Sequence, residues 1–413
     1  MPPWDLRGSI EQVVKLKAHH YGCQIGLAFH GNIAGVPHET AVFSSGADAT
    51  TRWAWGSVTK QFTGALLLQR YEQHGFDSLD DAAHRYVDPQ LLKLGLGSMA
   101  ALFGPEAQLI TLRQLATMAS GVPDYDTAKP DTPMPTDVFR ARCYARPDEV
   151  FGPAQILNLS WVAKGRLDFK PGTSGCYSST NFVLLGLALC SVQPSCNAWY
   201  DLKPGAVFDT LPPGQRKKFA GTSFAARVSP RAAGVIAGFD RTSYNGHDPN
   251  ARPGIDVSSV RGVFAGLTAS DVVAPAQDVA RFAYGLYGRT GTGILSEASR
   301  ALMTPTPAQA FYGFATFNFT QMNLAGATAN SERAHAYGHM GATYGYDSIS
   351  AYWPAADVAV AVATNIETID QVQPRDVVCS VLNTIFAWGD GAPRPPVCTY
   401  NATSYFSSAC HCH

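Results

Sequence analysis

Residues 55–60 read Trp55-Gly56-Ser57-Val58-Thr59-Lys60, and an apolar run with helical spacing continues from there to Gln73. Ser57 and Lys60 are three positions apart at the start of this predicted helix, so their side chains share one face. A serine hydroxyl becomes a useful nucleophile only beside a base, and a lysine can be that base if burial lowers its pKa. The N–H groups of a helix start also face developing negative charge. Taken alone, this short motif equally fits a capping serine followed by a surface lysine.

Two later stretches carry matching chemistry. Tyr177 lies between a Pro-Gly turn at 171–172 and an apolar helix that begins near Phe182. Its phenolic oxygen can relay a proton between a serine and a leaving group if a cation lies nearby; the alternative is a core tyrosine at a loop–helix junction. Residues 338–342, Gly-His-Met-Gly-Ala, lead into an apolar strand. There Gly341 lets the backbone approach a ligand closely, His339 can donate to a substrate or to Tyr177, and the Ala342 N–H can form half of an oxyanion hole. The alternative is a loop with a lone histidine.

The order of these three motifs resembles the serine β-lactamase-related superfamily, which includes class C β-lactamases, D-Ala-D-Ala carboxypeptidases, D-aminopeptidases and family VIII carboxylesterases. The resemblance extends over about residues 10–390. Further stretches of the same kind occur in the same order: Leu79-Asp80-Asp81, Ile110-Thr111-Leu112-Arg113-Gln114-Leu115, Ser120-Gly121-Val122-Pro123-Asp124-Tyr125, Ala280-Arg281-Phe282 and Thr364-Asn365.

The resemblance implies a role for each motif residue. Ser57 attacks the carbonyl, Lys60 is the leading candidate for its base, and Tyr177 passes a proton to the leaving group. The N–H groups of Ser57 and Ala342 hold the oxyanion. Ser179, His339 and Gly341 would contact the substrate, which is a small ester or amide, and no metal or organic cofactor is implied.

Two departures from the family pattern bear on the substrate. The family often has Asn two residues after the tyrosine, where this chain has Ser179, and class C β-lactamases have Lys-Thr-Gly where this chain has His339-Met340-Gly341. Losing that cation weakens a site for a β-lactam carboxylate. We therefore expect a carboxylesterase, with a D-amino-acid peptidase or carboxypeptidase, a β-lactamase, an acyltransferase and an inactive binding relative as alternatives.

The expected fold is of the β-lactamase/transpeptidase-like α/β (α+β) class, with an antiparallel sheet flanked by helices and an inserted, mostly helical lobe. We assign residues 1–56 and 300–395 to the sheet lobe, 57–299 to the helical lobe with long loops, and 396–413 to a cysteine-containing tail. The patterns predict a helix over 9–21 behind Ser9, a helix over 109–125, helical structure over 272–303 and a helix over about 373–388. They predict strands over 23–29, 311–314, 346–352 and 358–363.

Composition excludes some partners. The 31 basic and 32 acidic residues give a net charge of −1, which predicts no nucleic-acid partner. No apolar run has the ~20 residues of a membrane span. Met1-Pro2-Pro3-Trp4-Asp5 lacks the pattern of a signal peptide, yet the cysteines and the N-x-S/T sequons favour a secreted protein. The sequons lie at Asn158, Asn318 and Asn401, and the nine cysteines include the close pair Cys190 and Cys196 and three in the tail.

Three other patterns admit different interpretations. Residues 221–226, Gly-Thr-Ser-Phe-Ala-Ala, imitate the serine motif of subtilisin-type proteases, but no fitting Asp motif precedes the faint echo at His30-Gly31. The tail Cys410-His411-Cys412-His413 can bind a metal, although a disulfide or a loose tail is the favoured interpretation. Cys176, beside Tyr177, is expected to be structural or bridged, with a thiol near the site as the alternative.

Overall fold

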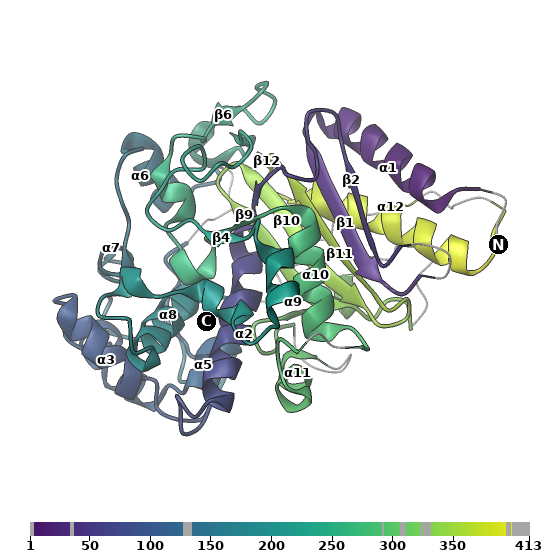
Figure 1. Ribbon diagram of the computed structural model, residues 1–413. Helices are drawn as coiled ribbons and strands as arrows, with labels where there is room; N and C mark the ends of the chain where they lie inside the picture. Colours follow the sequence, from purple (N-terminus) through teal and green to yellow (C-terminus); the bar gives the residue numbers. More distant parts are fainter. Residues whose placement is uncertain are drawn as a thin grey trace.

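The centre of the molecule is a six-stranded sheet whose strands come from both ends of the chain (Figure 1). The computed structural model describes residues 4–33, 37–126, 134–290, 293–305, 311–322, 324, 332–393 and 398. The strand order is β2-β1-β11-β10-β9-β8, and every neighbouring pair is antiparallel. The strands are β1 (Ile25–Gly31), β2 (Glu39–Phe43), β8 (Phe317–Asn318), β9 (Tyr337–Thr343), β10 (Tyr346–Trp353) and β11 (Val358–Thr364).

Helices cover both faces of this sheet. Helix α12 (Val372–Gly389) packs on β10 and β11 beside α1 (Leu6–Tyr21), and α10 (Ala276–Tyr287) packs on the opposite face against β1 and β11 (Figure 1). Because both faces are covered, all seven residues of β11 are buried. This explains why its sequence is continuously apolar instead of alternating.

Most of the remaining helices lie to one side of the sheet (Figure 1). They are α2 (Thr59–Glu72), α3 (His84–Lys93), α4 (Met99–Phe103), α5 (Leu112–Ala116), α6 (Val138–Ala145), α7 (Pro153–Leu157), α8 (Thr180–Val192) and α9 (Pro213–Arg216), with α11 (Glu297–Met303) after α10. The expected antiparallel sheet flanked by helices is confirmed. The lobe boundaries stay a prediction. Helix α10 lies within the range assigned to the helical lobe, yet it packs on the central sheet.

Two small sheets connect the helical part to the central sheet. One joins β3 (Trp53–Ala54), β7 (Val272–Ala274) and β4 (Ser223–Phe224). The other joins β12 (Ile366–Glu367), β5 (Phe239–Asp240) and β6 (Ile255–Asp256). The first leads directly into the Ser57 motif, since β3 ends two residues before Gly56.

Four expectations about local structure need correction. Helix α1 begins at Leu6, because the Asp5 carboxylate and not Ser9 caps it. The helix expected over 109–125 is only α5; Met118 has a left-handed φ of 61°, and the backbone carbonyls of residues 118, 119 and 121 accept hydrogen bonds from the 168–176 segment. Residues 272–303 contain strand β7 before α10, and α10 and α11 are separate helices. Of residues 311–314, Tyr312 alone bridges, to Phe317.

Candidate active site

Ser57 lies in a single turn, η1 (Gly56–Val58), between β3 and α2. Its side chain is partly exposed, whereas Lys60, on the first turn of α2, is fully buried. The Lys60 Nζ lies 2.8 Å from the Ser57 Oγ. The sequence spacing thus places the two side chains in direct contact, with the hydroxyl facing the surface and the amine beneath it.

The Nζ atom of Lys60 has two further hydrogen-bond partners. Its Nζ lies 3.1 Å from the Ser179 Oγ and 3.0 Å from the backbone oxygen of Ala269. Burial lowers the pKa of Lys60 from its usual range to about 7, and the nearby Asp124 carboxylate opposes that shift. A neutral amine donates two hydrogens and accepts one, so it can donate to Ala269 and Ser179 while it accepts the proton of Ser57. The geometry therefore suits a general base.

Tyr177 closes the other side of the Ser57 hydroxyl. It precedes α8, its hydroxyl hydrogen-bonds to Ser57 and Ser179, and its ring centre lies 5.0 Å from the Lys60 Nζ. The ring of Phe317 stacks on it with centroids 5.5 Å apart. Burial raises the pKa of Tyr177 far above its usual range, so the phenol keeps its proton. Tyr177 is thus arranged as a proton donor, and Lys60 as the proton acceptor.

Strand β9 approaches the Ser57 turn because two glycines leave room for it. A Cβ on Gly341 would lie 2.0 Å from the backbone oxygen of Trp55. Gly56 has a φ of 48°, and a Cβ there would lie 2.6 Å from the Ala342 oxygen. The backbones of Ala342 and of the Ser57 turn are therefore in contact.

The hairpin register indicates where the Ala342 N–H points. Thr343 pairs with Tyr346 across a two-residue turn, and Ala342 pairs with Asp347. The pair that closes such a turn exchanges hydrogen bonds, so the next pair is the one that does not. The Ala342 N–H then points away from β10, toward the Ser57 turn, which is the arrangement needed for an oxyanion hole with the Ser57 N–H.

His339 lies deeper than the sequence suggested. Its ring is fully buried, with Nε2 2.9 Å from the Tyr312 hydroxyl and Nδ1 hydrogen-bonded to the backbone oxygen of Met340. A carbonyl only accepts, so Nδ1 carries the proton and Nε2 accepts from Tyr312. Burial and the Lys60 charge hold the pKa of His339 well below its usual range. The expectation that His339 donates to a substrate or to Tyr177 is therefore not met, because its one proton is already used.

Ser179 lies beside Lys60 and Tyr177. It is buried, and its hydroxyl contacts Lys60 and Tyr177. Its backbone N–H donates to the Asp124 carboxylate at 2.9 Å. Ser179 thus helps to hold the lysine, and we keep substrate contact at this position as a proposal only.

Two participants were not assigned a role from the sequence. The backbone oxygen of Ala269 belongs to the turn η8 (Leu267–Ala269), and no side-chain pattern identifies it. Asp124 lies in the Ser-Gly-Val-Pro-Asp-Tyr stretch that carries the family resemblance, but its part in setting the charge of Lys60 depends on the folded chain. Burial raises the pKa of Asp124 to about 6.

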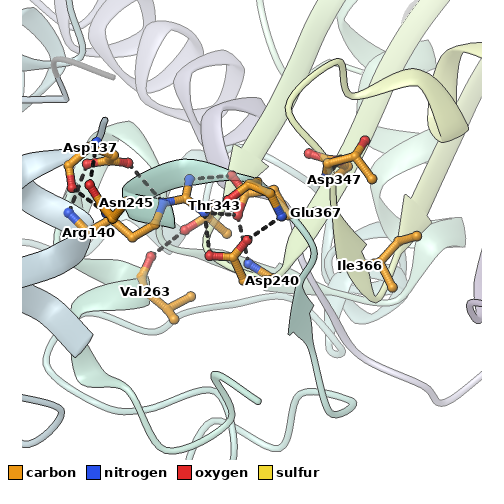
Figure 2. A network of polar contacts seen from close by, with 12 residues as sticks. Asp137, Arg140, Asp240, Asn245, Val263, Thr343, Asp347, Ile366 and Glu367 are labelled. Carbon is orange, nitrogen blue, oxygen red and sulfur yellow. Dashed lines mark hydrogen bonds and ion pairs between the residues drawn. The ribbon is translucent and has the colours of Figure 1, made fainter. Parts of the chain in front are cut away.

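A buried polar network contacts the turn of the β9–β10 hairpin (Figure 2). The Arg140 guanidinium of α6 donates to Glu367 at 2.8 Å through both Nη1 and Nη2, to Asp240 at 2.7 Å and to Asp137 at 3.0 Å. The Glu367 Oε2 also accepts the backbone N–H of Gly345 at 3.0 Å. Figure 2 shows these side chains converging from the helical part, the small sheet and the hairpin, so one cluster fixes their relative positions.

The competing interpretations receive no geometric support among the described residues. The Ser223 hydroxyl accepts from the Arg52 guanidinium, so its partner is a cation and not a base. Nor do these residues hold a group of three His, Cys, Asp or Glu side chains suited to a metal ion. The Cys410-His411-Cys412-His413 tail lies outside them.

The cysteines form two bridges that the structure describes. The expected Cys190–Cys196 pair is present and closes the loop after α8. Cys398 of the tail joins Cys379 of α12. Of the sequons, Asn158 is exposed and Asn318 is buried, while Asn401 lies outside the described residues. None of the described helices is long and apolar enough to span a membrane.

Comparison with known proteins agrees with this geometry. Residues 24–194 match the family model described as Beta-lactamase. This match, together with the structures compared below, supports the serine β-lactamase and penicillin-binding-protein-like superfamily. That match includes Ser57, Lys60 and Tyr177, and it supports a serine hydrolase in general terms. No curated protein sequence matches the chain significantly.

Solved structures extend the likeness over most of the length of this chain. The D-amino acid amidase from Ochrobactrum anthropi SV3 complexed with D-phenylalanine superposes with a TM-score of 0.69 at 18% identity, over 93% of this chain and 100% of that one. The D-stereospecific amidohydrolase from a Streptomyces species gives 0.63 at 19% identity, over 87% and 94%. The penicillin binding protein from Bacillus halodurans gives 0.62 at 18% identity, over 90% and 100%. At these identities the likeness shows the fold.

Proposed function

We propose that this chain is a carboxylesterase that forms a covalent acyl-enzyme on Ser57. The observation that carries the proposal is the 2.8 Å contact between the Ser57 Oγ and the buried Nζ of Lys60, whose pKa burial lowers to about 7. At neutral pH a substantial fraction of Lys60 is then uncharged and able to accept the serine proton.

The reaction proceeds in two acyl-transfer steps. The Ser57 oxygen bonds to the ester carbonyl carbon while its proton passes to Lys60, and the N–H groups of Ser57 and Ala342 stabilise the oxyanion. The carbon–alkoxide bond then breaks as Tyr177 protonates the leaving oxygen, and Lys60 returns a proton to Tyr177. Water repeats the sequence on the acyl-enzyme, releasing the acid and restoring the Ser57 hydroxyl.

The electrostatics of the site support esters over substrates that carry a carboxylate. In the third motif, where class C β-lactamases have a lysine, His339 is neutral and buried beneath Tyr312. It offers no cation for a β-lactam carboxylate or a peptide C-terminus. An uncharged ester needs no such cation.

Hydrolysis of D-amino acid amides is the second candidate. Two of the similar structures are named as a D-amino acid amidase and a D-stereospecific amidohydrolase. An amine leaving group also needs a proton more than an alkoxide does, and Tyr177 retains its proton.

The test compares purified wild type, Ser57→Ala and the control Ser223→Ala on p-nitrophenyl butyrate, a chromogenic cephalosporin and D-alanyl p-nitroanilide. We expect ester turnover that falls by about 10⁴-fold or more in Ser57→Ala and is kept in Ser223→Ala. A fluorophosphonate probe should add its mass at Ser57. Turnover of the anilide or the cephalosporin without ester turnover would replace the ester assignment by a peptidase or a β-lactamase.

Two remaining alternatives have their own outcomes. Ester product formed on adding a nucleophilic alcohol would indicate acyl transfer, since the same acyl-enzyme serves both reactions. No labelling of Ser57 together with silence on all three substrates would favour an inactive binding relative.

We also propose that the protein acts on small molecules in an extracellular setting. The two disulfides and the exposed sequon at Asn158 support an oxidising compartment. Mass spectrometry for glycan at Asn158 and free-thiol counting on protein from its natural source test this.

A further inference from the structure

A cavity of about 320 Å³ lies against α8 and the turn η8. Its walls come from α8, from the segment that begins with η3 (Trp199–Asp201), from β4 and from η8. Neither Ser57, Lys60 nor Tyr177 lines it. A space of this size is within the range of small-molecule sites and far larger than one water requires.

The floor of the cavity holds a buried carboxyl group with unused hydrogen-bonding capacity. Asp271 lines the cavity at 2% exposure. Its Oδ1 has no hydrogen-bond partner within the part of the chain that the structure describes. A buried polar atom left without a partner destabilises the fold. A ligand hydroxyl that reaches Asp271 would remove that destabilisation.

The rim holds a cation against two aromatic rings. The Arg227 guanidinium lies 5.4 Å from the centre of the Tyr200 ring and 6.0 Å from that of Trp199, and all three side chains line the cavity. Arg227 is exposed, with a left-handed φ of 75°. A guanidinium that rests against aromatic rings keeps N–H donors for a carboxylate.

Apolar side chains also line the cavity. They include Val183, Leu187 and Leu267, which are buried. Burial raises the pKa of Asp271 well above its usual range, so the floor is a neutral acid and Arg227 gives the cavity its charge. The lining thus combines an exposed cation, buried apolar side chains and a buried hydrogen-bonding group.

We propose that this cavity is a second small-molecule site, separate from the Ser57 cleft, for an apolar carboxylic acid with a hydroxyl at its far end. The carboxylate pairs with Arg227, the body lies between the aromatic rim and the aliphatic wall, and the hydroxyl bonds to Asp271. The proposal does not depend on the chemistry of Ser57.

The experiment uses 3-(4-hydroxyphenyl)propanoate as the probe and measures its binding to full-length Ser57→Ala by calorimetry. We expect saturable binding with a Kd on the order of 0.1–1 mM. The amide of the probe, which lacks the charge, and 3-phenylpropanoate, which lacks the hydroxyl, should each bind about tenfold more weakly.

Variants then assign each preference to its residue. Arg227→Gln should abolish the preference for the acid over its amide and leave the preference for the hydroxyl. Asp271→Leu should do the reverse, and Arg231→Gln, an exposed arginine outside the lining, should change neither. No saturation at about 10 mM probe, or preferences that survive both variants, would overturn the proposal. Since Arg227 is exposed, its variant remains informative even if Asp271→Leu does not fold.

Discussion

Arg140 and Glu367 are joined by two hydrogen bonds of 2.8 Å in a buried site, 227 residues apart in the chain. One of the Glu367 oxygens in this pair also accepts the Gly345 N–H at the tip of the β9–β10 hairpin. A cation from the helical part therefore fixes, through one carboxylate, the hairpin that carries Ala342.

Arg140→Met should lower the free energy of unfolding by about 3–5 kcal/mol at pH 8, because it leaves Asp240 and Glu367 buried without their cation. Burial raises the pKa of Glu367 already in the wild type, whereas the Arg140 charge outweighs burial and holds the pKa of Asp240 below its usual range. Loss of the cation raises both folded-state pKa values, and the resulting destabilisation is present at high pH and fades as pH falls toward about 4. Urea unfolding at pH 8 and pH 5 should show a smaller loss at pH 5. Arg7→Met, at the exposed Arg7–Glu11 pair, is the control. Equal losses at both pH values would contradict this account.

Gly341→Ala should reduce kcat/KM by about 10²-fold while the far-ultraviolet spectrum is kept. The new Cβ would overlap the Trp55 oxygen and push the strand with the Ala342 N–H away from Ser57. Gly389→Ala is a matched control, since a Cβ there meets nothing within 4 Å. Unchanged turnover in Gly341→Ala would remove Ala342 from the oxyanion hole.

Acylation by Ser57 should increase as pH rises through about 7, because the reactive form of Lys60 is the neutral amine. The Asp124 charge raises the pKa of Lys60, so Asp124→Asn should move the midpoint of this increase to lower pH. Pre-steady-state burst rates between pH 5 and 9 measure both. A midpoint that stays in place or moves upward would show that another group controls the rate.

Glu39→Gln should cost about 1–2 kcal/mol of stability at pH 7, and this cost should begin to shrink as pH falls below about 4. The Arg281 guanidinium donates to both Glu39 oxygens at 2.8 Å, and with His30 it holds the pKa of Glu39 well below its usual range. A carboxyl of lowered pKa stabilises the fold above its unfolded pKa, and this contribution is lost as pH falls through the folded one. The figure is modest because Glu39 is 35% exposed. Denaturant unfolding, with Glu11→Gln as the control at an exposed pair, tests it.

The features predicted correctly from the sequence are those set by residues that lie close together in the chain. The spacing of Ser57 and Lys60 is fixed by one helical turn, and β11 is an apolar run of strand length. The helix over 109–125 was overestimated because the backbone after α5 bonds to a segment some fifty residues away. The hydrogen bonds of His339, the charge of Asp124 and the Arg140 cluster are likewise properties of tertiary contact. No local pattern around Arg140 distinguishes it from a surface arginine.

The antiparallel pairing of β1 with β11, in which Ile25 faces Thr364, has a consequence for the newborn chain. A ribosome adds about 5–20 residues per second, so β1 leaves it tens of seconds before its partner exists. Throughout that interval an apolar strand has one edge without its native neighbour. The helical part can form early, but the Ser57 turn meets Ala342 only near the end of synthesis. The nascent chain can therefore aggregate through β1 before its active site is assembled. A chaperone that shields β1 during synthesis should raise the yield of active protein.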